Sequence, residues 1–519
     1  MAEAQAASEM HNDTNATNNK RIARNTLLLY VRMLFIMAVS LYTSRVVLAV
    51  LGEVDYGVYN VVGGIVVMFT MISAPLTTAV TRFLNFELGR GHIDKLQKVF
   101  STSMNIQLII SAVIVVLAET VGVWFLNAKM NIPADRMWAA NWVLQCSIAT
   151  FVINLLSVPY NATIIAHERM NIYAYISILE VTLKLVVVYL LVISPWDKLA
   201  IYAVLLAIVA LGVQLTYAIY CRRHFQECRW SSHIDKPMMR EMLGFSGWNF
   251  IGAASGICRD QGVNIVINIF CGPVVNAARG IAVQVNTAIN SFVQNFMVAL
   301  NPQITKSYAT GEKDYMFSLL FRGARFSFYL LLFLSLPVLA NTSWILHLWL
   351  EEVPEYTIVF VQLILVFAMC ESVSNPLITA MLATGNIRNY QLLVGGLQLL
   401  NLPGSYALLH FGFPPQSTLV FAIIMSLSCL IARLWMLHGM IGLPVRAFSR
   451  QVLLNVVCVG FLSGVLPVAL AIYMTPSLLT FIVSSVASVI CSTWAILYVG
   501  CQQSERGFVI SQIRKKLHI

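Results

Sequence analysis

The side chains of this sequence that could bind a charged ligand gather between Arg259 and Gly311. The stretch is apolar enough to lie in a lipid bilayer, yet it contains two arginines, an aspartate and a series of amides: Arg259, Asp260, Asn264, Asn268, Asn276, Arg279, Asn286, Asn290 and Gln294. Guanidinium groups keep their charge and form bidentate pairs with phosphate oxygens. These residue types therefore favour recognition of a phosphorylated anion.

Two membrane helices joined by a turn at Cys271-Gly272-Pro273 would position these side chains. At ~100° per residue, the polar residues of the second helix, from Asn276 to Gln294, fall within an arc of about 80°. An unpaired polar group in hydrocarbon costs several kcal/mol, so this stripe must face other helices or internal water. An arginine in such a stripe indicates a functional site.

Other charges lie inside the predicted spans. The central cations outnumber the carboxylates Glu180, Asp260 and Glu371, and a cavity with excess arginine suits a polyanion. The candidate substrate-binding residues are Arg32, Arg45, Lys184, Arg259, Arg279, Asn286 and Asn290. Two alternatives stay open: the arginines only join helices through backbone carbonyls, and Lys184 only forms an internal ion pair with Glu180.

A second polar set accompanies Pro376. Glu371, Asn375 and Thr379 step by four along one predicted span, and a proline there frees a backbone carbonyl. Broken helices of this kind often line ion sites, so the coupling-ion candidates are Asp260, Glu371 and Asn375. Adjacent residues on a helix project about 100° apart, so Arg259 and Asp260 need not pair with each other.

The composition predicts the elements that carry these residues. The chain has 519 residues, of which 58% are hydrophobic and 11% charged, against ~25% charged in an average soluble domain. It is therefore expected to be an all-α polytopic membrane protein. About 14 transmembrane helices are expected, near 25–50, 56–81, 99–126, 138–165, 173–194, 200–220, 242–269, 275–303, 324–346, 358–383, 391–410, 417–438, 451–473 and 478–500.

The basic residues predict the orientation. When the loops alternate sides from an inside N-terminus, most of the 33 lysines and arginines fall in inside loops and tails, Arg433 and Arg325 among them. The outside loops take only Lys129, Arg136 and Lys198. This asymmetry predicts that both termini are cytoplasmic, and it explains the net charge of +10 without nucleic acid.

Two pairs of similar segments in the sequence predict an internal repeat. Gly91 and Asp94 recur as Gly311 and Asp314 at an offset of 220 residues, and the segment 157–173 resembles 374–390 at an offset of 217. Six helices separate the copies, which indicates two parallel six-helix lobes around a central cavity. The expected parts are a disordered cytoplasmic tail (1–20), an N-terminal lobe (21–220), a cytoplasmic linker (221–240), a C-terminal lobe (241–440), a further helix pair (441–502) and a basic cytoplasmic tail (503–519).

The motifs LGEVDYGVYN (51–60), GRGHIDKLQKVF (89–100), HERMNIY (167–173), AARGIAVQVN (277–286) and NPQITKSYATGEKD (301–314) together make the chain similar to a known family. It resembles the Wzx-type polysaccharide flippases of the multidrug/oligosaccharidyl-lipid/polysaccharide (MOP) exporter superfamily. The resemblance implies a multi-pass protein of the bacterial cytoplasmic (inner) membrane that works by alternating access. The implied substrate is an undecaprenyl-pyrophosphate-linked oligosaccharide for O-antigen, capsule or exopolysaccharide.

The resemblance also implies roles for residues and partners. Cavity arginines in the family contact the lipid pyrophosphate, and by position Arg32, Arg45, Arg259 and Arg279 correspond to them. The pair at 450–500 looks similar to one whose groove holds the lipid tail in lipid II flippases. The implied partners are the lipid-linked oligosaccharide, the bilayer and glycan-assembly proteins, and a monomer is favoured.

Two other functions remain open from the sequence. One is a cation-coupled drug exporter of the MATE type, with the same fold. The other is a membrane-embedded glycan polymerase or ligase, which would need a catalytic outside loop that the sequence does not offer. The ten cysteines are scattered singly and no phosphate loop, HExxH or Ser/His/Asp arrangement is present, so we expect no metal, no cofactor and no enzymatic reaction.

Overall fold

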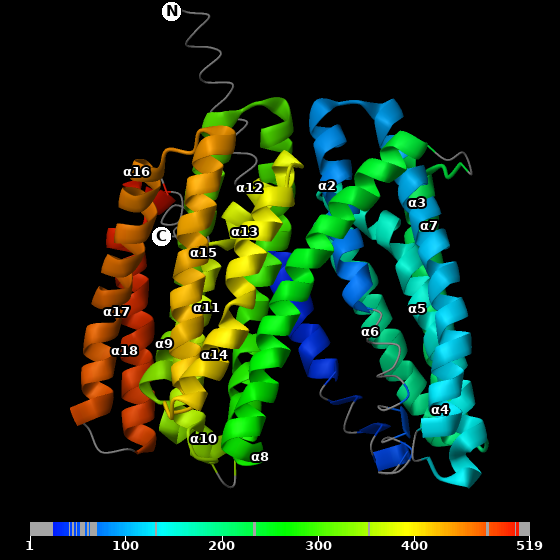
Figure 1. Cartoon of the computed structure of the whole chain (residues 1–519), viewed down its shortest axis with the longest axis horizontal. Helices are drawn as coiled ribbons and strands as arrows, with labels where there is room; N and C mark the ends of the chain where they lie inside the picture. The colour runs from blue at the N-terminus through cyan, green and yellow to red at the C-terminus, as the bar shows by residue number, and fades with distance from the viewer. Residues whose placement is uncertain are drawn as a thin grey trace, which may run out of the picture. The chain divides into compact units, whose positions relative to one another are not determined.

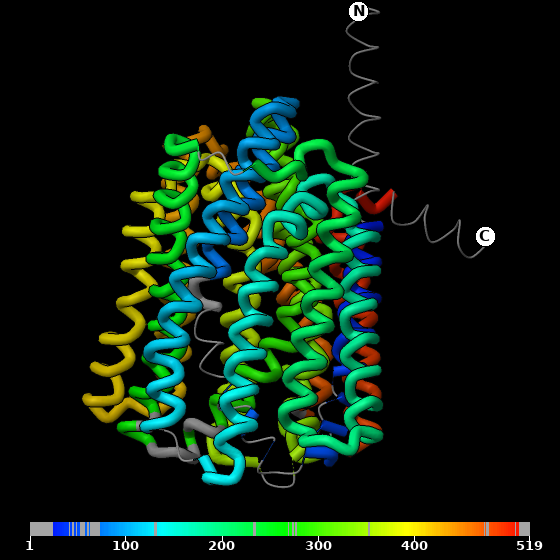
Figure 2. Tube along the Cα trace, turned by 90° about the vertical axis from the view of Figure 1, so that its right-hand side faces the viewer, coloured from blue at the N-terminus to red at the C-terminus, as the bar shows by residue number. Residues whose placement is uncertain are grey.

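The computed structural model describes residues 24–507 except for 41, 44–45, 48, 52–54, 56–57, 60–61, 63–69, 130–131, 232–234, 351–352, 474–476 and 504. The regular secondary structure of this described part is entirely helical. The chain forms two compact units, Met1–Phe250 and Ile251–Ile519, which we call the N-unit and the C-unit. Their boundary falls inside helix α8. Within each unit the helices run side by side in both views (Figure 1 and Figure 2).

The N-unit is a bundle built on α5. Its elements are α2 (Thr70–Arg90), α3 (Ile93–Leu117), the π-helical turn η1 (Ala118–Gly122), α4 (Val123–Lys129), the 3-10 turn η2 (Ala134–Arg136), α5 (Met137–Ala166), α6 (Met170–Ile193), α7 (Lys198–His224), the 3-10 turn η3 (Gln226–Cys228) and the start of α8 (Lys236–Thr310). Helix α5 packs along α7 and also contacts α2, α3 and α6. The residues of α5 are apolar on all faces of the helix, which is typical of a helix at the centre of a membrane bundle.

The segment 226–231, which follows α7, binds the polar face of α3. The indole Nε1 of Trp230 donates to Asn105 Oδ1 at 2.9 Å, and the backbone N–H of Ser231 donates to Ser101 Oγ at 3.2 Å. Beside it, the Glu227 carboxylate lies 2.5 Å from His167 Nε2 at the end of α5. This part of the expected linker is therefore fixed to the N-unit.

The C-unit contains the rest of α8 and a second bundle. Its other elements are α9 (Lys313–Ala340), α10 (Thr342–Trp349), α11 (Thr357–Ser372), α12 (Asn375–Thr384), α13 (Arg388–Leu399), α14 (Asn401–His410), α15 (Ser417–Ile441), α16 (Val445–Phe448), the π-helical turn η4 (Ser449–Leu453), α17 (Leu454–Tyr473), α18 (Leu478–Ala495) and the π-helical turn η5 (Ile496–Gly500).

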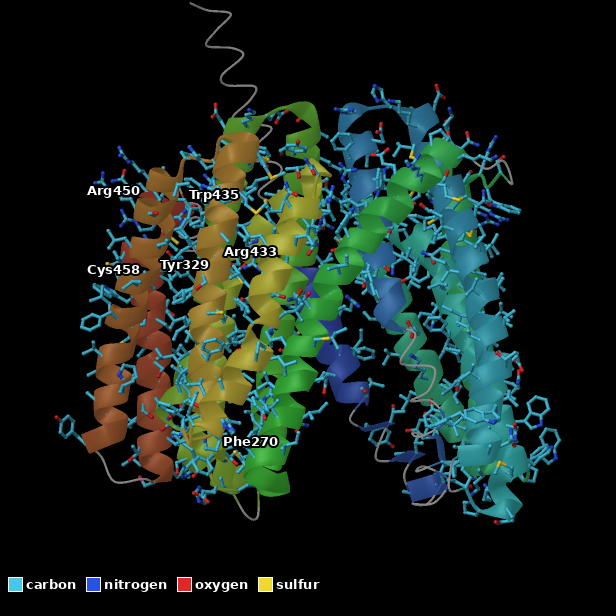
Figure 3. The ribbon with its side chains drawn as sticks, viewed as in Figure 1. Phe270, Tyr329, Arg433, Trp435, Arg450 and Cys458 are labelled. Carbon is cyan, nitrogen blue, oxygen red and sulfur yellow. The ribbon has the colours of Figure 1, made fainter. Side chains whose placement is uncertain are left out.

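Helix α8 is 75 residues long, and a straight helix of that length would span about 110 Å. Figure 1 and Figure 3 show instead that it folds back, with Phe270 near the foot where its arms meet. We call 251–270 the first arm and 275–310 the second arm. The expected pair of helices is present, but the expected turn at Cys271-Gly272-Pro273 is wrong in form, because the helix is assigned continuously through it. A proline can kink a helix without replacing it by a loop.

Each arm of α8 contacts different helices of the C-unit. Phe270 of the first arm meets Tyr406 of α14 edge-on, with ring centroids 5.2 Å apart. From the second arm, Asn301 Oδ1 accepts a hydrogen bond from Thr379 of α12 at 2.8 Å. Valines and alanines of both arms share one core cluster with α11.

Nine helices of the described residues are long and apolar enough to cross a membrane, and the pair α11–α12, bent by 40°, makes a tenth. Four other expected spans account for the difference from fourteen. Two of them, 25–50 and 56–81, include residues outside the described part. The other two are the arms of α8, whose polar residues lower the hydropathy. The chain is an all-α polytopic membrane protein, and the break at Pro376 is confirmed.

The two glycine junctions from which the repeat was predicted have the same helix-end geometry. Gly91 N–H donates to Leu88 and His92 N–H to Glu87, while Gly311 N–H donates to Tyr308 and Glu312 N–H to Ser307. Both are Schellman caps, and both glycines have positive φ, 71° and 78°, which glycine adopts without strain. The same six-residue pattern therefore ends a helix at both positions, 220 residues apart.

The second pair of similar segments, 157–173 and 374–390, also shares the geometry of a helix end, at an offset of 217. Glu168 N–H donates to Ile165 after α5, and Gly385 N–H donates to Leu382 after α12. Both residues are left-handed, with φ 57° and 78°. A glutamate in the N-unit thus occupies the conformation that a glycine has in the C-unit.

Helices α17 and α18 pack on each other and both contact α9. Arg325 of α9 donates to the Gly500 carbonyl at 3.0 Å and to Glu505 at 2.8 Å. Tyr329, labelled in Figure 3, donates to the same carbonyl at 3.1 Å. At the C-terminal end of α9, Ser484 of α18 donates to Asn341 at 2.8 Å. The helix pair is thus bonded to the middle of α9 and to its C-terminal end.

Candidate functional site

The C-unit encloses a cavity of about 470 Å³. Both arms of α8, together with α11, α12, α14 and α15, supply its walls. Seven of the residues expected from the sequence line it: Arg259, Asp260, Arg279, Asn286, Asn290, Glu371 and Asn375. They meet because α8 folds back; on a straight helix Arg259 and Asn290 would be about 46 Å apart.

Arg259 is paired inside this cavity. Its Nε lies 2.8 Å from Asp260 Oδ1 and its Nη2 lies 3.3 Å from Oδ2. The guanidinium also lies over the Phe367 ring, 5.3 Å from its centroid. The sequence left open whether Arg259 and Asp260 pair, and in the structure they do, because a long arginine side chain can turn back across the 100° between neighbours.

Arg279 is in the opposite situation. Only 7% of the residue is exposed, and its Nε and Nη1 have no hydrogen-bond partner among the described residues. We call these two groups the open donors. A buried donor without a partner costs about 1–3 kcal/mol, and more when it is charged. The cavity thus contains a cation whose hydrogen-bonding capacity is unused.

Two amides of the cavity have unused acceptors. The Oδ1 atoms of Asn286, on the second arm, and of Asn401, at the start of α14, are buried and accept no hydrogen bond within the described structure. Asn401 is only 3% exposed. We call these atoms the open acceptors. The sequence analysis did not single out Asn401, because it follows the kink between α13 and α14, far from the stripe on α8.

Glu371 lies at the end of α11, where the bent span breaks. Its Oε1 accepts a hydrogen bond from Ser426 of α15 at 2.6 Å. It interacts electrostatically with both Arg259 and Arg433. Asn375 begins α12 across the break. The carboxylate therefore belongs to a network that connects the cavity with the interior of α15.

Arg433 was placed in an inside loop by the sequence analysis, and this is wrong. It lies within α15, near Trp435 in Figure 3, and only 1% of it is exposed. It interacts with Tyr390, and its Nε and Nη1 are unpaired in the part of the chain that the structure describes. Its helical register with Ser426, Cys429 and Leu430, all buried, is the sequence signal that could have placed it.

The cations expected in the first lobe lie in the N-unit. Arg32 has its guanidinium 4.3 Å from the centroid of the Tyr173 ring and donates to the Tyr173 hydroxyl at 3.3 Å. Lys184 Nζ lies 2.6 Å from Glu180 Oε1, as in the ion-pair alternative, and both side chains remain partly exposed. Arg45 lies outside the described residues.

The charges that line the cavity are balanced. Two arginines face two carboxylates, Asp260 and Glu371, so the expected cationic surplus is not a property of this cavity. Arg279 differs from the other charged groups of the cavity in having unused hydrogen-bond donors. Asp260 is bound to Arg259, and Glu371 accepts a hydrogen bond from Ser426, whereas the open donors belong to Arg279. Within the described residues no group of His, Cys, Asp or Glu is arranged to hold a metal ion.

Comparison with known proteins gives a family and a fold. Residues 22–308 match the model of the family described as polysaccharide biosynthesis protein. A search of the curated proteins finds no match.

Among solved structures, the chain is similar to an outward-facing multidrug resistance MATE family transporter of the MOP superfamily (TM-score 0.71, 12% identity, 82% of this chain and 97% of that chain covered). It is also similar to a MOP superfamily transporter from Pyrococcus furiosus described as having a binding pocket of reverse polarity (TM-score 0.68, 12% identity, 82% and 97% covered). A third is the Vibrio cholerae MATE transporter VcmN (TM-score 0.67, 16% identity, 82% and 98% covered). At these identities the likeness establishes the fold.

Proposed function

The chain belongs to the polysaccharide biosynthesis protein family and has the fold of the MOP-superfamily transporters, and on this premise we propose that it carries an undecaprenyl-pyrophosphate-linked oligosaccharide across the bacterial cytoplasmic membrane. The transport would proceed by alternating access, and the product would serve the assembly of a surface polysaccharide. The partners would be the lipid-linked oligosaccharide and the proteins that extend it.

One observation carries the proposal, namely the open donors of Arg279 in the cavity of the C-unit. An arginine cannot lose its proton, so a buried one must be neutralised by an anion. Arg259 already has Asp260 as a counter-ion, whereas Arg279 has capacity for a bidentate pair with a phosphate group. A pyrophosphate would remove the cost of leaving these donors unsatisfied.

The alternative of a MATE-type exporter of lipophilic cations draws support only from the fold. A cationic drug would be attracted by unpaired carboxylates. In this cavity Asp260 is paired with Arg259, and Glu371 accepts from Ser426. The open charge is positive, and this favours an anionic substrate.

For the driving force, Glu371 is the first candidate among the coupling residues, with Asn375 beside it and Asp260 less available. Its position at a helix break next to the cavity is typical of an ion-binding carboxylate in transporters. Glu371→Gln would remove the dependence of transport on a proton or sodium gradient while leaving binding of the diphosphate intact. Reconstituted vesicles with and without the gradient measure this, and an unchanged dependence would exclude Glu371.

The test of the function is complementation of a flippase-null strain. Arg279→Ala should lower surface glycan at least tenfold, with lipid-linked units accumulating on the inner leaflet. Arg279→Lys keeps the charge but loses bidentate geometry, so it should restore part of the glycan. Arg450→Ala, at an exposed arginine of η4 (Figure 3), is the matched control and should complement fully. Full complementation by an Arg279→Ala protein that inserts normally would contradict the proposal.

A further inference from the structure

The cavity of the C-unit offers two kinds of unsatisfied group. The open donors of Arg279 need hydrogen-bond acceptors, whereas the open acceptors of Asn286 and Asn401 need hydrogen-bond donors. A single ligand that satisfies both must have one part rich in anionic oxygens and another part that presents O–H or N–H groups. A simple polyanion such as pyrophosphate has no such donors when it is ionised.

The spacing separates the two kinds of group. Arg279 and Asn286 lie seven residues apart on the second arm of α8, so they share one face and are about 10 Å apart along the axis. Asn290 and Gln294 continue the same face and also line the cavity. Asn401 approaches from another wall, on α14. An anion bound at Arg279 would therefore extend along a series of amides.

Amides are well suited to a sugar ring. A carbonyl oxygen of asparagine accepts from hydroxyl or acetamido N–H groups, while its NH₂ donates to sugar oxygens. A cavity of about 470 Å³ is within the range of small-molecule sites, which is enough for one sugar with its diphosphate but not for a whole oligosaccharide.

We infer that Asn286 and Asn401 bind the sugar residue attached directly to the lipid diphosphate and determine which sugar is accepted at that position. This inference rests on the proposed function, because it assigns the diphosphate to Arg279. Selection arises because a sugar that offers no donor to a buried carbonyl leaves that carbonyl unsatisfied and therefore binds more weakly.

The experiment measures binding of two soluble probes to the purified full chain in detergent. The first is citronellyl diphosphate, and the second is citronellyl diphosphate carrying one sugar, taken in turn as glucose, galactose, N-acetylglucosamine and N-acetylgalactosamine. The wild-type protein should bind at least one glycosylated probe more tightly than the bare diphosphate. Asn286→Leu and Asn401→Leu should each weaken that probe roughly 5–10-fold and leave the bare diphosphate within twofold, the size expected for one hydrogen bond.

Controls make the outcomes distinct. Asn389→Leu, an exposed asparagine of α13 outside this cavity, should change neither probe. Asn401→Gln keeps the amide and should retain part of the sugar-dependent gain. Should Asn401→Leu fail to fold, Asn286→Leu tests the same inference from another helix.

Three results would overturn the inference: no glycosylated probe exceeds the bare diphosphate, the leucine variants bind every probe as wild type does, or they weaken both kinds of probe equally. Arg279→Ala tests the underlying function separately, because it should lose the bare diphosphate as well. If Arg279→Ala loses both probes while the asparagine variants change neither, the flippase function stands and the sugar assignment falls. If Arg279→Ala keeps the bare diphosphate, the proposed function itself falls.

Discussion

Two arginines of one helix, twenty residues apart, have opposite electrostatic surroundings. Arg259 is covered by Phe367 and neutralised by Asp260, so its burial is compensated. Arg279 is almost fully buried, and its open donors form no hydrogen bond within the described residues, although the Asp260 carboxylate acts on it electrostatically. Two arginines of one helix thus differ in whether their hydrogen-bond donors are free to bind a ligand. Only the contacts of each side chain show this difference.

The pairing of Arg259 makes a prediction for Asp260→Asn. Loss of the carboxylate should lower the free energy of unfolding by about 1–3 kcal/mol, because Arg259 keeps its charge without its counter-ion. The same change should tighten binding of citronellyl diphosphate, because a second guanidinium becomes available. Thermal unfolding and probe binding on the same preparation measure both effects. Weaker binding of the diphosphate would show that Asp260 supports the site rather than competing for it.

In the segment that follows α7 in the N-unit, Glu227 predicts a pH dependence. Burial alone would raise the pKa of this carboxyl, but the hydrogen bond and charge of His167 and the residue's own backbone N–H outweigh it, so the pKa lies below its ordinary value. Its stabilising effect is therefore present above the ordinary glutamate pKa of about 4.3 and is lost as the pH falls through the folded-state pKa.

The variant Glu227→Gln should unfold at a lower temperature than wild type at pH 7, and its melting temperature should fall less between pH 7 and pH 3. Melting curves of both proteins in detergent check this, with Glu119→Gln at the far end of the N-unit as control. Parallel pH profiles of wild type and Glu227→Gln would remove the assigned role.

For single residues, the sequence predicted which side chains line the cavity better than it predicted their contact partners. Arg279 and Asn286 were found from helical periodicity and Arg259 from its charge in an apolar stretch, and all three line one cavity. Arg325 and Arg433 were assigned to inside loops because each lies near a predicted helix end. Their actual partners, Glu505 and Tyr390, are distant in sequence, and a charge count along the chain contains no information on such contacts.

Among the elements, the matching helix caps are the clearest product of local sequence. The junctions at Gly91 and Gly311 were found because each glycine and the aspartate three residues later recur at an offset of 220, and both glycines have the positive φ that glycine favours. The junction at Glu168 was found only by its similarity to 385, because glutamate rarely marks a left-handed residue.

The caps predict opposite effects on stability for two glycine-to-alanine substitutions. Gly91→Ala should lower the free energy of unfolding by about 1 kcal/mol, because a side chain at positive φ is strained. Gly212→Ala, within α7 and with open space around its Cα, should raise it by about 0.5–1 kcal/mol. Denaturation in mixed micelles measures both variants. Equal effects of the two changes would contradict the cap.

The attachment of α17 and α18 to α9 gives a second prediction for elements. Arg325 is buried and bonded to both Gly500 and Glu505, whereas Arg322, which also contacts Glu505, is more exposed. Arg325→Ala should cost about 3–5 kcal/mol, because Glu505 and the Gly500 carbonyl lose a charged donor in a buried place.

Arg322→Ala should cost less than about 1 kcal/mol. Limited proteolysis between α15 and α16, together with melting temperature, compares the two variants. Equal protease resistance of Arg325→Ala and wild type would show that apolar packing alone attaches the pair.

For the molecule as a whole, hydropathy predicted the class of membrane protein well and the number of membrane-spanning helices less well. The apolar helices of the described part were predicted almost completely, because mean hydropathy over about 20 residues measures what a bilayer requires. The arms of α8 fall below such a criterion because their polar residues lower the mean hydropathy. The sequence predicted two lobes separated by a linker at 221–240, whereas the two compact units divide after Phe250, inside the continuous helix α8.

The orientation remains a prediction from the basic residues. Green fluorescent protein fused at the C-terminus should fluoresce, and alkaline phosphatase fused after Trp196, between α6 and α7, should be active. The same phosphatase fused after Asn386, between α12 and α13, should be inactive. Activity in the opposite pattern would place the termini outside.

The shared caps at 87–92 and 307–312 have a consequence for origin. A hydrogen-bond pattern, a glycine and an acidic residue three positions later coincide in both places, and a second junction follows at nearly the same interval. Duplication and fusion of a gene for a half-length ancestor would produce both coincidences at once. Such an ancestor, with an even number of spans, would need no inverted insertion, and its two copies could then diverge independently.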